Sequence, residues 1–197
     1  MENINEILAL FDTPDKWNAF IELSNMRDKM VAELKTRLNK ELQKIADSSS
    51  LNTKGWKCWF DDNSLTIKPI NNSLIGITIE WNWWGYEWCR RGACLWVDAK
   101  SINSTAVSEN IKKKKKLLPL QDYEENIENH TWFPFVKQIP STVFNVDDNI
   151  TTVEECLYMA KDNSSQLAKN IWEEVFKPFI NKETADLMLD FVKQKSK

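Results

Sequence analysis

The stretch from Ile75 to Trp83 reads Ile-Gly-Ile-Thr-Ile-Glu-Trp-Asn-Trp, and it decides the fold. Its odd-numbered positions are all large and apolar, whereas the even-numbered positions are glycine, threonine, glutamate and asparagine. Alternation with a period of two predicts a β-strand, because successive side chains of a strand point to opposite faces of a sheet. One face of this strand is therefore expected to pack on a hydrophobic core.

The same period in neighbouring segments predicts an antiparallel sheet over residues 55–100. Leu65–Lys68 alternates in the same way, and Ala93–Lys100 is expected to form a fourth strand. Short polar connections at 61–63 and 71–73 predict hairpins. Strands with such short links pair with their neighbours in the chain, so we expect a meander. The second face also carries apolar residues, so either helices cover it or it is a docking surface.

A long helix is predicted before the sheet, over about 14–46. Thr13 is a good N-cap and Pro14 suits the first helical position. Apolar residues then recur at spacings of three and four, from Trp17 to Ile45. Such a helix would be roughly 50 Å long, which exceeds a typical domain helix. We therefore expect it to bend or to project at one end.

The remaining segments complete an α+β fold with a single domain, residues 1–197. Further helices are expected at 3–10, 107–116 and 122–129, from a capping box at 151–154, in a segment that stops near Pro178, and at 181–195. Thr142–Val146 is expected to be a fifth strand at the sheet edge. The chain thus divides into a helical arm (1–50), the antiparallel sheet (55–100), an irregular charged connection (101–150) and a helical C-terminal third (151–197).

Composition excludes several common classes of protein. The formal charge is −3, so the whole molecule is not a general polyanion binder, and only four arginines accompany 22 lysines. No apolar run is long enough to span a bilayer, and no leader sequence is evident, which predicts a cytoplasmic protein. The four cysteines are then expected to be reduced thiols. No cofactor or metal is predicted.

Seven of the ten tryptophans fall between Trp56 and Trp96, which is the main functional signal. Tryptophan, tyrosine and arginine dominate interface energies, and these residue types occur together just after the third strand. A run of lysines near residue 112 adds a second basic point. The predicted binding residues are Trp83, Trp84, Tyr86, Trp88, Arg90, Arg91, Lys112, Lys113 and Lys114.

These observations predict a non-enzymatic protein that binds a macromolecular partner. The expected partner is a protein or ribonucleoprotein, with direct nucleic-acid contact as an open alternative and no contact with membranes. One specific hypothesis is a phage or mobile-element protein that inhibits a nucleic-acid-processing host defence complex such as a CRISPR effector. It is motivated by small size, absent catalytic motifs and a composition rich in lysine and asparagine. Carbohydrate binding by stacked tryptophans is a third, less favoured class.

The alternative function is that of a metal-dependent nuclease. Asp98-Ala99-Lys100 resembles the second half of the PD-(D/E)xK nuclease signature, in which an acid and a lysine share a strand face beside a metal ion. This resemblance implies that Asp98 holds Mg²⁺ and Lys100 orients the attacking water. It needs an upstream acid, and Asp61 or Asp62 are the candidates. The rest of the signature is absent.

A structural zinc site is a weaker alternative. Cys89 and Cys94 are separated by a turn, as two ligands of a zinc site can be. The other two ligands would have to come from Cys58, Cys156 and the single histidine, His130. The same histidine would have to serve any serine or cysteine nucleophile, and it lies in a polar stretch without a nucleophile motif.

Overall fold

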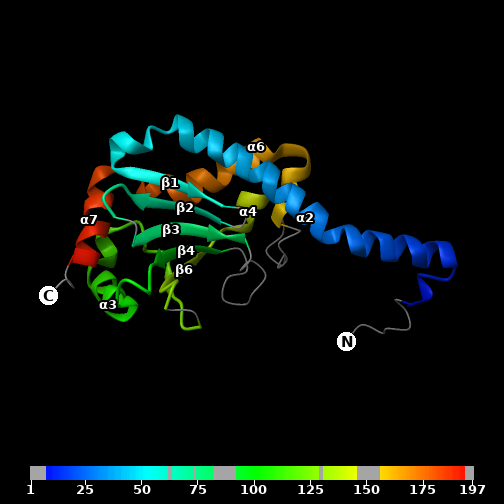
Figure 1. The fold of residues 1–197 in the computed structure, drawn as a ribbon, viewed down its shortest axis with the longest axis horizontal. Helices are drawn as coiled ribbons and strands as arrows, with labels where there is room; N and C mark the ends of the chain where they lie inside the picture. Colours follow the sequence, from blue (N-terminus) through cyan, green and yellow to red (C-terminus); the bar gives the residue numbers. More distant parts are fainter. Residues whose placement is uncertain are drawn as a thin grey trace.

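The structure is a computed structural model that describes residues 8–61, 64–72, 74–81, 92–128, 131–145 and 156–193. The predicted α+β class and antiparallel meander are confirmed. The first four strands are consecutive neighbours, each antiparallel to the next: β1 (Trp56–Phe60), β2 (Ser64–Pro69), β3 (Ile75–Glu80) and β4 (Gly92–Val97). Figure 1 shows these strands in the centre of the molecule, with helices around them.

Two further strands extend the sheet beyond β4. β6 (Phe135–Gln138) pairs with β4, and the two-residue β5 (Glu124–Glu125) pairs with β6 at the edge. The predicted helix at 122–129 is therefore wrong over its described part. Its charged residues favoured a helix locally, but the backbone of Glu124 and Glu125 pairs with Val136 and Phe135 instead.

The predicted edge strand at Thr142–Val146 is also wrong. Ser141–Phe144 forms a single helical turn, α4, which follows Pro140 and ends at Asn145 in the left-handed conformation (φ 53°). Proline suits the start of a helical turn and asparagine is one of the few residues that tolerate a positive φ at its end. The fifth strand of the meander is instead β6, directly after Pro134.

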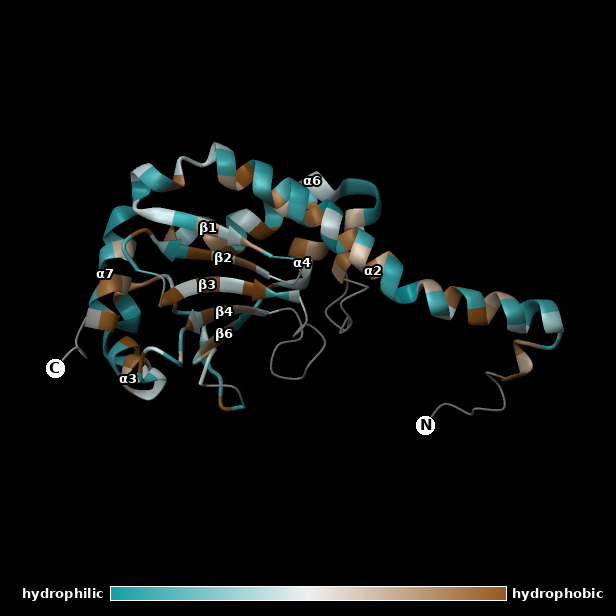
Figure 2. Ribbon diagram, viewed as in Figure 1, coloured by the Kyte–Doolittle hydropathy of each residue, from teal (hydrophilic) through white to brown (hydrophobic). Residues whose placement is uncertain are grey.

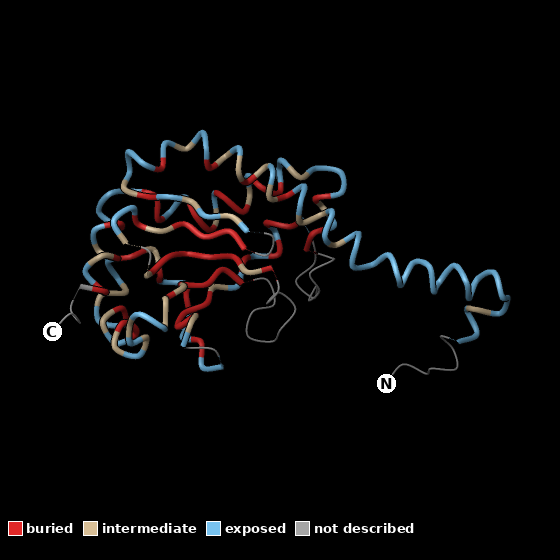
Figure 3. Tube along the Cα trace, in the orientation of Figure 1, coloured by how far each residue is buried: buried red, intermediate tan, exposed pale blue. Residues whose placement is uncertain are grey.

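The long helix α2 (Pro14–Ser48) begins and projects as predicted. The Thr13 side chain accepts a hydrogen bond from the backbone N–H of Lys16 (3.3 Å), and Pro14 is the first helical residue. Leu38, Leu42 and Ala46 in its second half are buried. Its first half extends away from the sheet and is exposed along its length (Figures 1 and 3).

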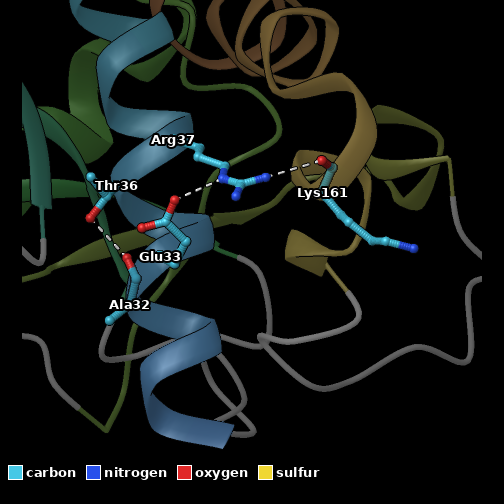
Figure 4. A network of polar contacts seen from close by, with 5 residues as sticks. All are labelled: Ala32, Glu33, Thr36, Arg37 and Lys161. Carbon is cyan, nitrogen blue, oxygen red and sulfur yellow. Dashed lines mark hydrogen bonds and ion pairs between the residues drawn. The ribbon is translucent and has the colours of Figure 1, made fainter. Parts of the chain in front are cut away.

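Arg37 joins α2 to the helix α6 (Met159–Ile171), as Figure 4 shows. Its guanidinium donates to Glu33 (2.9 Å) and to the backbone carbonyl of Lys161 (3.3 Å). Asn163 breaks the helical backbone of α6 (φ −146°, ψ 60°), which interrupts the helical hydrogen bonds at that point. Arg37 therefore supplies a donor to a carbonyl beside the break, where a helix would otherwise leave acceptors unsatisfied.

The apolar face of the sheet carries the core. Ile77 lies between Ile67 and Leu95 on the neighbouring strands, and all three are fully buried. The Trp56 indole N–H on this face donates to the carbonyl of Asn181 (2.9 Å), just before α7 (Lys182–Lys193). Helix α7 contacts β2 and β3, and α6 passes behind the strands in Figure 1.

The remaining described helices frame this core. A 3₁₀ turn (Leu51–Lys54) links α2 to β1; α3 (Ser104–Lys114) and a 3₁₀ turn (Lys115–Leu117) follow β4; a π-helical turn (Trp172–Phe176) and a 3₁₀ turn (Lys177–Phe179) join α6 to α7. The predicted helix end near Pro178 agrees with this break, whereas the predicted capping box at 151–154 lies outside the described residues. No described helix is both long and apolar enough to cross a membrane.

Candidate functional site

The second face of the sheet presents two lysines and two tryptophans. Strand register places Lys57 opposite Lys68 and Trp59 opposite Thr66, and Trp96 lies on the same face of β4. Trp59 is 63% exposed and Lys57 is exposed, while Lys68 and Trp96 are half-buried. We call these four residues the Lys/Trp face. No labelled helix crosses in front of the strands in Figure 1, which is the side away from α6.

The two lysines form an unfavourable pair within the chain. Like charges directly opposite one another on a sheet are destabilising, and Lys57 and Lys68 are such cross-strand partners. Burial, and then the nearby Lys57 ammonium, lower the pKa of Lys68. An anion placed between the two ammonium groups would relieve both effects.

Lys68 reaches Trp96 across the glycine at position 76. Its ammonium lies 4.0 Å from the centroid of the indole ring, in a cation–π contact. Gly76 is the partner of Trp96 in the register, and a Cβ there would meet the carbonyl oxygen of Ile67 at 2.6 Å and Cγ of Lys68 at 3.0 Å. The glycine therefore leaves the space through which the lysine stem passes.

The centre of this face is buried and polar. The hydroxyls of Thr66 and Thr78 are hydrogen-bonded to each other (2.8 Å), and Thr78 also donates to the carbonyl of Leu65 (3.2 Å). Cys94 lies beside Thr78 and is fully buried. The exposed part of the face is thus its β1 margin, where Lys57 and Trp59 lie on the edge strand.

An acidic cluster closes one end of the face. Asp61 accepts hydrogen bonds from the backbone N–H and the hydroxyl of Ser64, both at 2.7 Å, and so holds the β1–β2 turn. Glu80 is the register partner of Ser64. Burial, together with the nearby Asp61 carboxylate, raises the pKa of Glu80 to about 7. Glu80 is therefore a titratable group near neutral pH at the end of β3.

Most of the predicted binding residues belong to the connection from β3 to β4. Trp83, Trp84, Tyr86, Trp88, Arg90 and Arg91 lie outside the described residues. Their places along the chain follow from the sequence: Trp81, which is buried, precedes them, and Gly92 at the start of β4 follows them. Their role in binding stays a prediction.

The lysine run is largely engaged by its own chain. The Lys112 ammonium contacts Glu109 (3.2 Å) and Glu125 (2.8 Å), and these hydrogen bonds raise its pKa. Lys114 lies over the ring of Phe191 (5.9 Å to the centroid), and the neighbouring Lys115 donates to the carbonyl of Tyr123. Lys113 is exposed. These contacts dock α3 onto β5 and α7 and leave less of the run available to phosphates.

The residues of the nuclease alternative do not come together. Asp61 follows β1 and Asp98 follows β4, and these strands are antiparallel, so their ends lie at opposite edges of the sheet. Six residues of strand separate the two positions in the register, which is roughly 20 Å. Asp98 accepts hydrogen bonds from Lys100 N–H (3.1 Å) and from the Ser101 hydroxyl (2.8 Å), so it holds a turn. Asp62 lies outside the described residues.

The zinc ligands considered from the sequence are also separated. Cys58 faces the apolar side of the sheet, because it is the partner of Ile67, whereas Cys94 lies on the opposite face. Burial raises the pKa of the Cys58 thiol to about 12, which disfavours the thiolate that binds metal. Within the described ranges no three histidine, cysteine or acidic side chains form a group that could hold a metal ion, and Cys89 and His130 lie outside them.

Sequence reasoning missed Lys57 and Lys68 as binding residues. The signal was present in the hairpin, because a turn at 61–63 pairs Phe60 with Leu65 and so places Lys57 opposite Lys68. Lysines at matching distances from a hairpin turn share a face. Reading each strand alone does not reveal the pair.

Comparison of the chain with protein-family models, with curated proteins and with solved structures finds no match. The function is therefore argued from the geometry of the Lys/Trp face.

Proposed function

We propose that this chain is a non-enzymatic protein that binds a nucleic-acid-containing partner through its Lys/Trp face. The observation that carries the proposal is the like-charge pair of Lys57 and Lys68 beside exposed Trp59. Strands of nucleic acid offer phosphates for the ammonium groups and bases that stack on indole rings. This combination of residues suits single strands, whose bases are free to stack.

The predicted residues of the β3–β4 connection extend the same proposal. Arg90 and Arg91 would add positive charge, and Trp84 and Trp88 would add stacking surfaces. The overall charge of −3 limits binding to this local surface, because the rest of the molecule repels polyanions. A nucleoprotein partner, whose protein component contacts the aromatic residues, fits the same surface. Inhibition of a host defence complex such as a CRISPR effector remains a hypothesis within this class.

Binding of a labelled single-stranded RNA and DNA, followed by fluorescence anisotropy over a salt series, tests the proposal. The variant K57Q/K68Q is expected to weaken binding and to reduce the slope of log affinity against log salt by about two, one for each lost phosphate contact. Trp59→Ala is expected to weaken binding by about tenfold or more through lost stacking. K44Q/K177Q, which removes two exposed lysines elsewhere, serves as the control with the same loss of charge.

Equal affinities for wild type and K57Q/K68Q would overturn the proposed surface. Absence of any nucleic-acid binding would direct the search to a protein partner, by affinity capture with wild type and W59A as paired baits. For the β3–β4 connection, the variant W84A/W88A/R90A/R91A is expected to lose binding while its thermal unfolding remains cooperative. Loss of the fold in that variant would mean that these residues belong to the core.

The nuclease alternative is tested in the same preparation. Incubation of the nucleic acids with Mg²⁺ or Mn²⁺ should leave them intact, because Asp61 and Asp98 lie at opposite edges of the sheet. Cleavage that is lost in Asp98→Asn would instead establish the alternative.

A further inference from the structure

The projecting part of α2, residues 14–30, which we call the arm, carries an apolar stripe that the described body of the protein does not cover. Leu23, Met26 and Met30 are 64%, 51% and 54% exposed. Together with Ala19 they are spaced by four, three and four residues, which is the heptad spacing of a coiled-coil seam. Figure 2 shows hydrophobic residues along this part of the helix.

This stripe differs from the stripe that anchors α2 to the body. With 3.6 residues per turn, Leu23 and Met30 lie about a quarter turn around the helix from Leu38 and Leu42, which are fully buried. The aromatic residues at the helix start are partly covered locally, since the rings of Phe11 and Phe20 are 4.6 Å apart. A second helix can therefore lie along the stripe while α2 keeps its contacts with the body.

We propose that the arm pairs with the arm of a second copy of this chain, in antiparallel orientation. In this register, Leu23 packs against Met26 of the second copy, and Ala19 packs against Met30 of the second copy. The pairing has a two-fold axis between residues 24 and 25, so each contact occurs twice. The proposal concerns a surface separate from the Lys/Trp face and does not depend on the function of that face.

Charge complementarity argues for a second copy as the occupant. Residues 12–22 contain three acidic residues and one lysine, whereas residues 27–37 contain four basic residues and two acidic residues. Antiparallel pairing places each end opposite the other. It brings Glu22 beside Lys29 of the second copy on one flank of the seam, and Phe20 beside Arg27 of the second copy on the other flank.

The same charges disfavour the parallel arrangement. Seam positions 16 and 33 would then face their own copies, lysine against lysine and glutamate against glutamate. In the antiparallel register, Lys16 faces Glu33 of the second copy, and the two bodies lie at opposite ends of the pair. The orientation therefore follows from the seam positions themselves.

Sedimentation equilibrium of the full chain over a micromolar concentration series tests the pairing. Wild type is expected to show a concentration-dependent dimer. Leu23→Glu is expected to raise the dimer dissociation constant by about tenfold or more, because it places a charge in the seam. Leu10→Glu is the matched control, since Leu10 is 66% exposed and precedes the helix, and it should dimerise like wild type.

A charge exchange tests the orientation. Glu22→Lys and Lys29→Glu are each expected to weaken the dimer, and E22K/K29E together should restore it, because the exchanged residues again face opposite charges. Asp28→Lys makes the same charge change as E22K on the outer side of the arm, where its side chain is 93% exposed, and should have no effect.

A wild type that stays monomeric throughout the concentration series would overturn the proposal, as would a dimer that L23E leaves intact. Failure of E22K/K29E to restore the dimer would overturn the antiparallel orientation. Binding of single-stranded RNA by L23E, measured at a concentration where wild type is monomeric, separates this result from the proposed function. It should match wild type.

Discussion

Gly76 and Glu80 lie on the same strand, and each has a role that its neighbours impose. Gly76 is surrounded by the Lys68 stem and the Ile67 carbonyl. Glu80 is partly buried and lies near Asp61. Neither role comes from an unusual backbone conformation, since only Gly55, Ser50 and Asn145 have a positive φ among the described residues.

Gly76→Ala is expected to lower the free energy of unfolding by about 2 kcal/mol, because the new methyl group must displace strand backbone. Urea denaturation measures the change. Gly55→Ala provides a contrast, since its cost comes from a φ of 84° rather than from a close contact in the sheet. A neutral effect of G76A would show that β2 can move away without loss, and that the passage for Lys68 is not tight.

Glu80 makes stability depend on pH in a defined direction. Its pKa is raised to about 7 from 4.5, so between these values the folded protein keeps a proton that the unfolded chain has released. The free energy of unfolding therefore falls as pH rises through this window, and the penalty is complete above about pH 7.

Glu80→Gln is accordingly expected to stabilise the protein by about 1–2 kcal/mol near pH 8, after allowance for solvent screening of a partly exposed group, and to have little effect near pH 4.5. Thermal unfolding at both pH values measures the difference. Glu124→Gln, on an exposed glutamate of β5, is the control. A stabilisation that is equal at the two pH values would contradict the assignment to Glu80 ionisation.

At the scale of elements, α2 shows one helix in two environments. Its second half is stabilised by burial of Leu38, Leu42 and Ala46 and by the Arg37 contact with α6 (Figure 4). Its first half depends on the Thr13 cap, the initial proline and ion pairs such as Lys16 with Asp12 (2.7 Å). Exposed pairs of this kind contribute only tenths of a kcal/mol. The two halves should therefore respond differently to the same substitution.

Leu38→Ala is expected to lower the free energy of unfolding by about 2–5 kcal/mol, because it leaves a cavity in the core. Leu23→Ala, measured by the same urea titration at a concentration where the chain is monomeric, should change it by less than about 0.5 kcal/mol. A large loss in L23A under these conditions would show that the arm folds back onto the body.

For the whole molecule, the Lys/Trp face exchanges stability for binding capacity. The Lys57–Lys68 pair is repulsive in the isolated chain and becomes favourable only with an anionic partner. Lys57→Gln is therefore expected to raise the free energy of unfolding by up to about 0.5 kcal/mol, more at low salt, while nucleic-acid affinity falls. Lys44→Gln should not gain stability, because Lys44 pairs with Glu41 at 2.6 Å. A destabilised K57Q would mean that Lys57 has a favourable contact in the folded chain.

The sequence by itself determined the meander and the start of α2. Alternation from Ile75 fixes which residues of β3 face the core, and the short turns determine the pairing of β1 to β4, because both signals are local in the chain. Thr13 and Pro14 likewise mark the helix start through local hydrogen bonding and backbone geometry.

Only the tertiary structure decided the elements and sites that depend on distant partners. Phe135–Gln138 is a strand because β4 offers it a free edge, and Lys112 is engaged because Glu125 lies beside it. The apolar residues of the arm are exposed because the helix is longer than the body it packs on, although their spacing resembles that of the buried half. Period and capping report local preference, whereas burial and charge pairing depend on which segments meet in space.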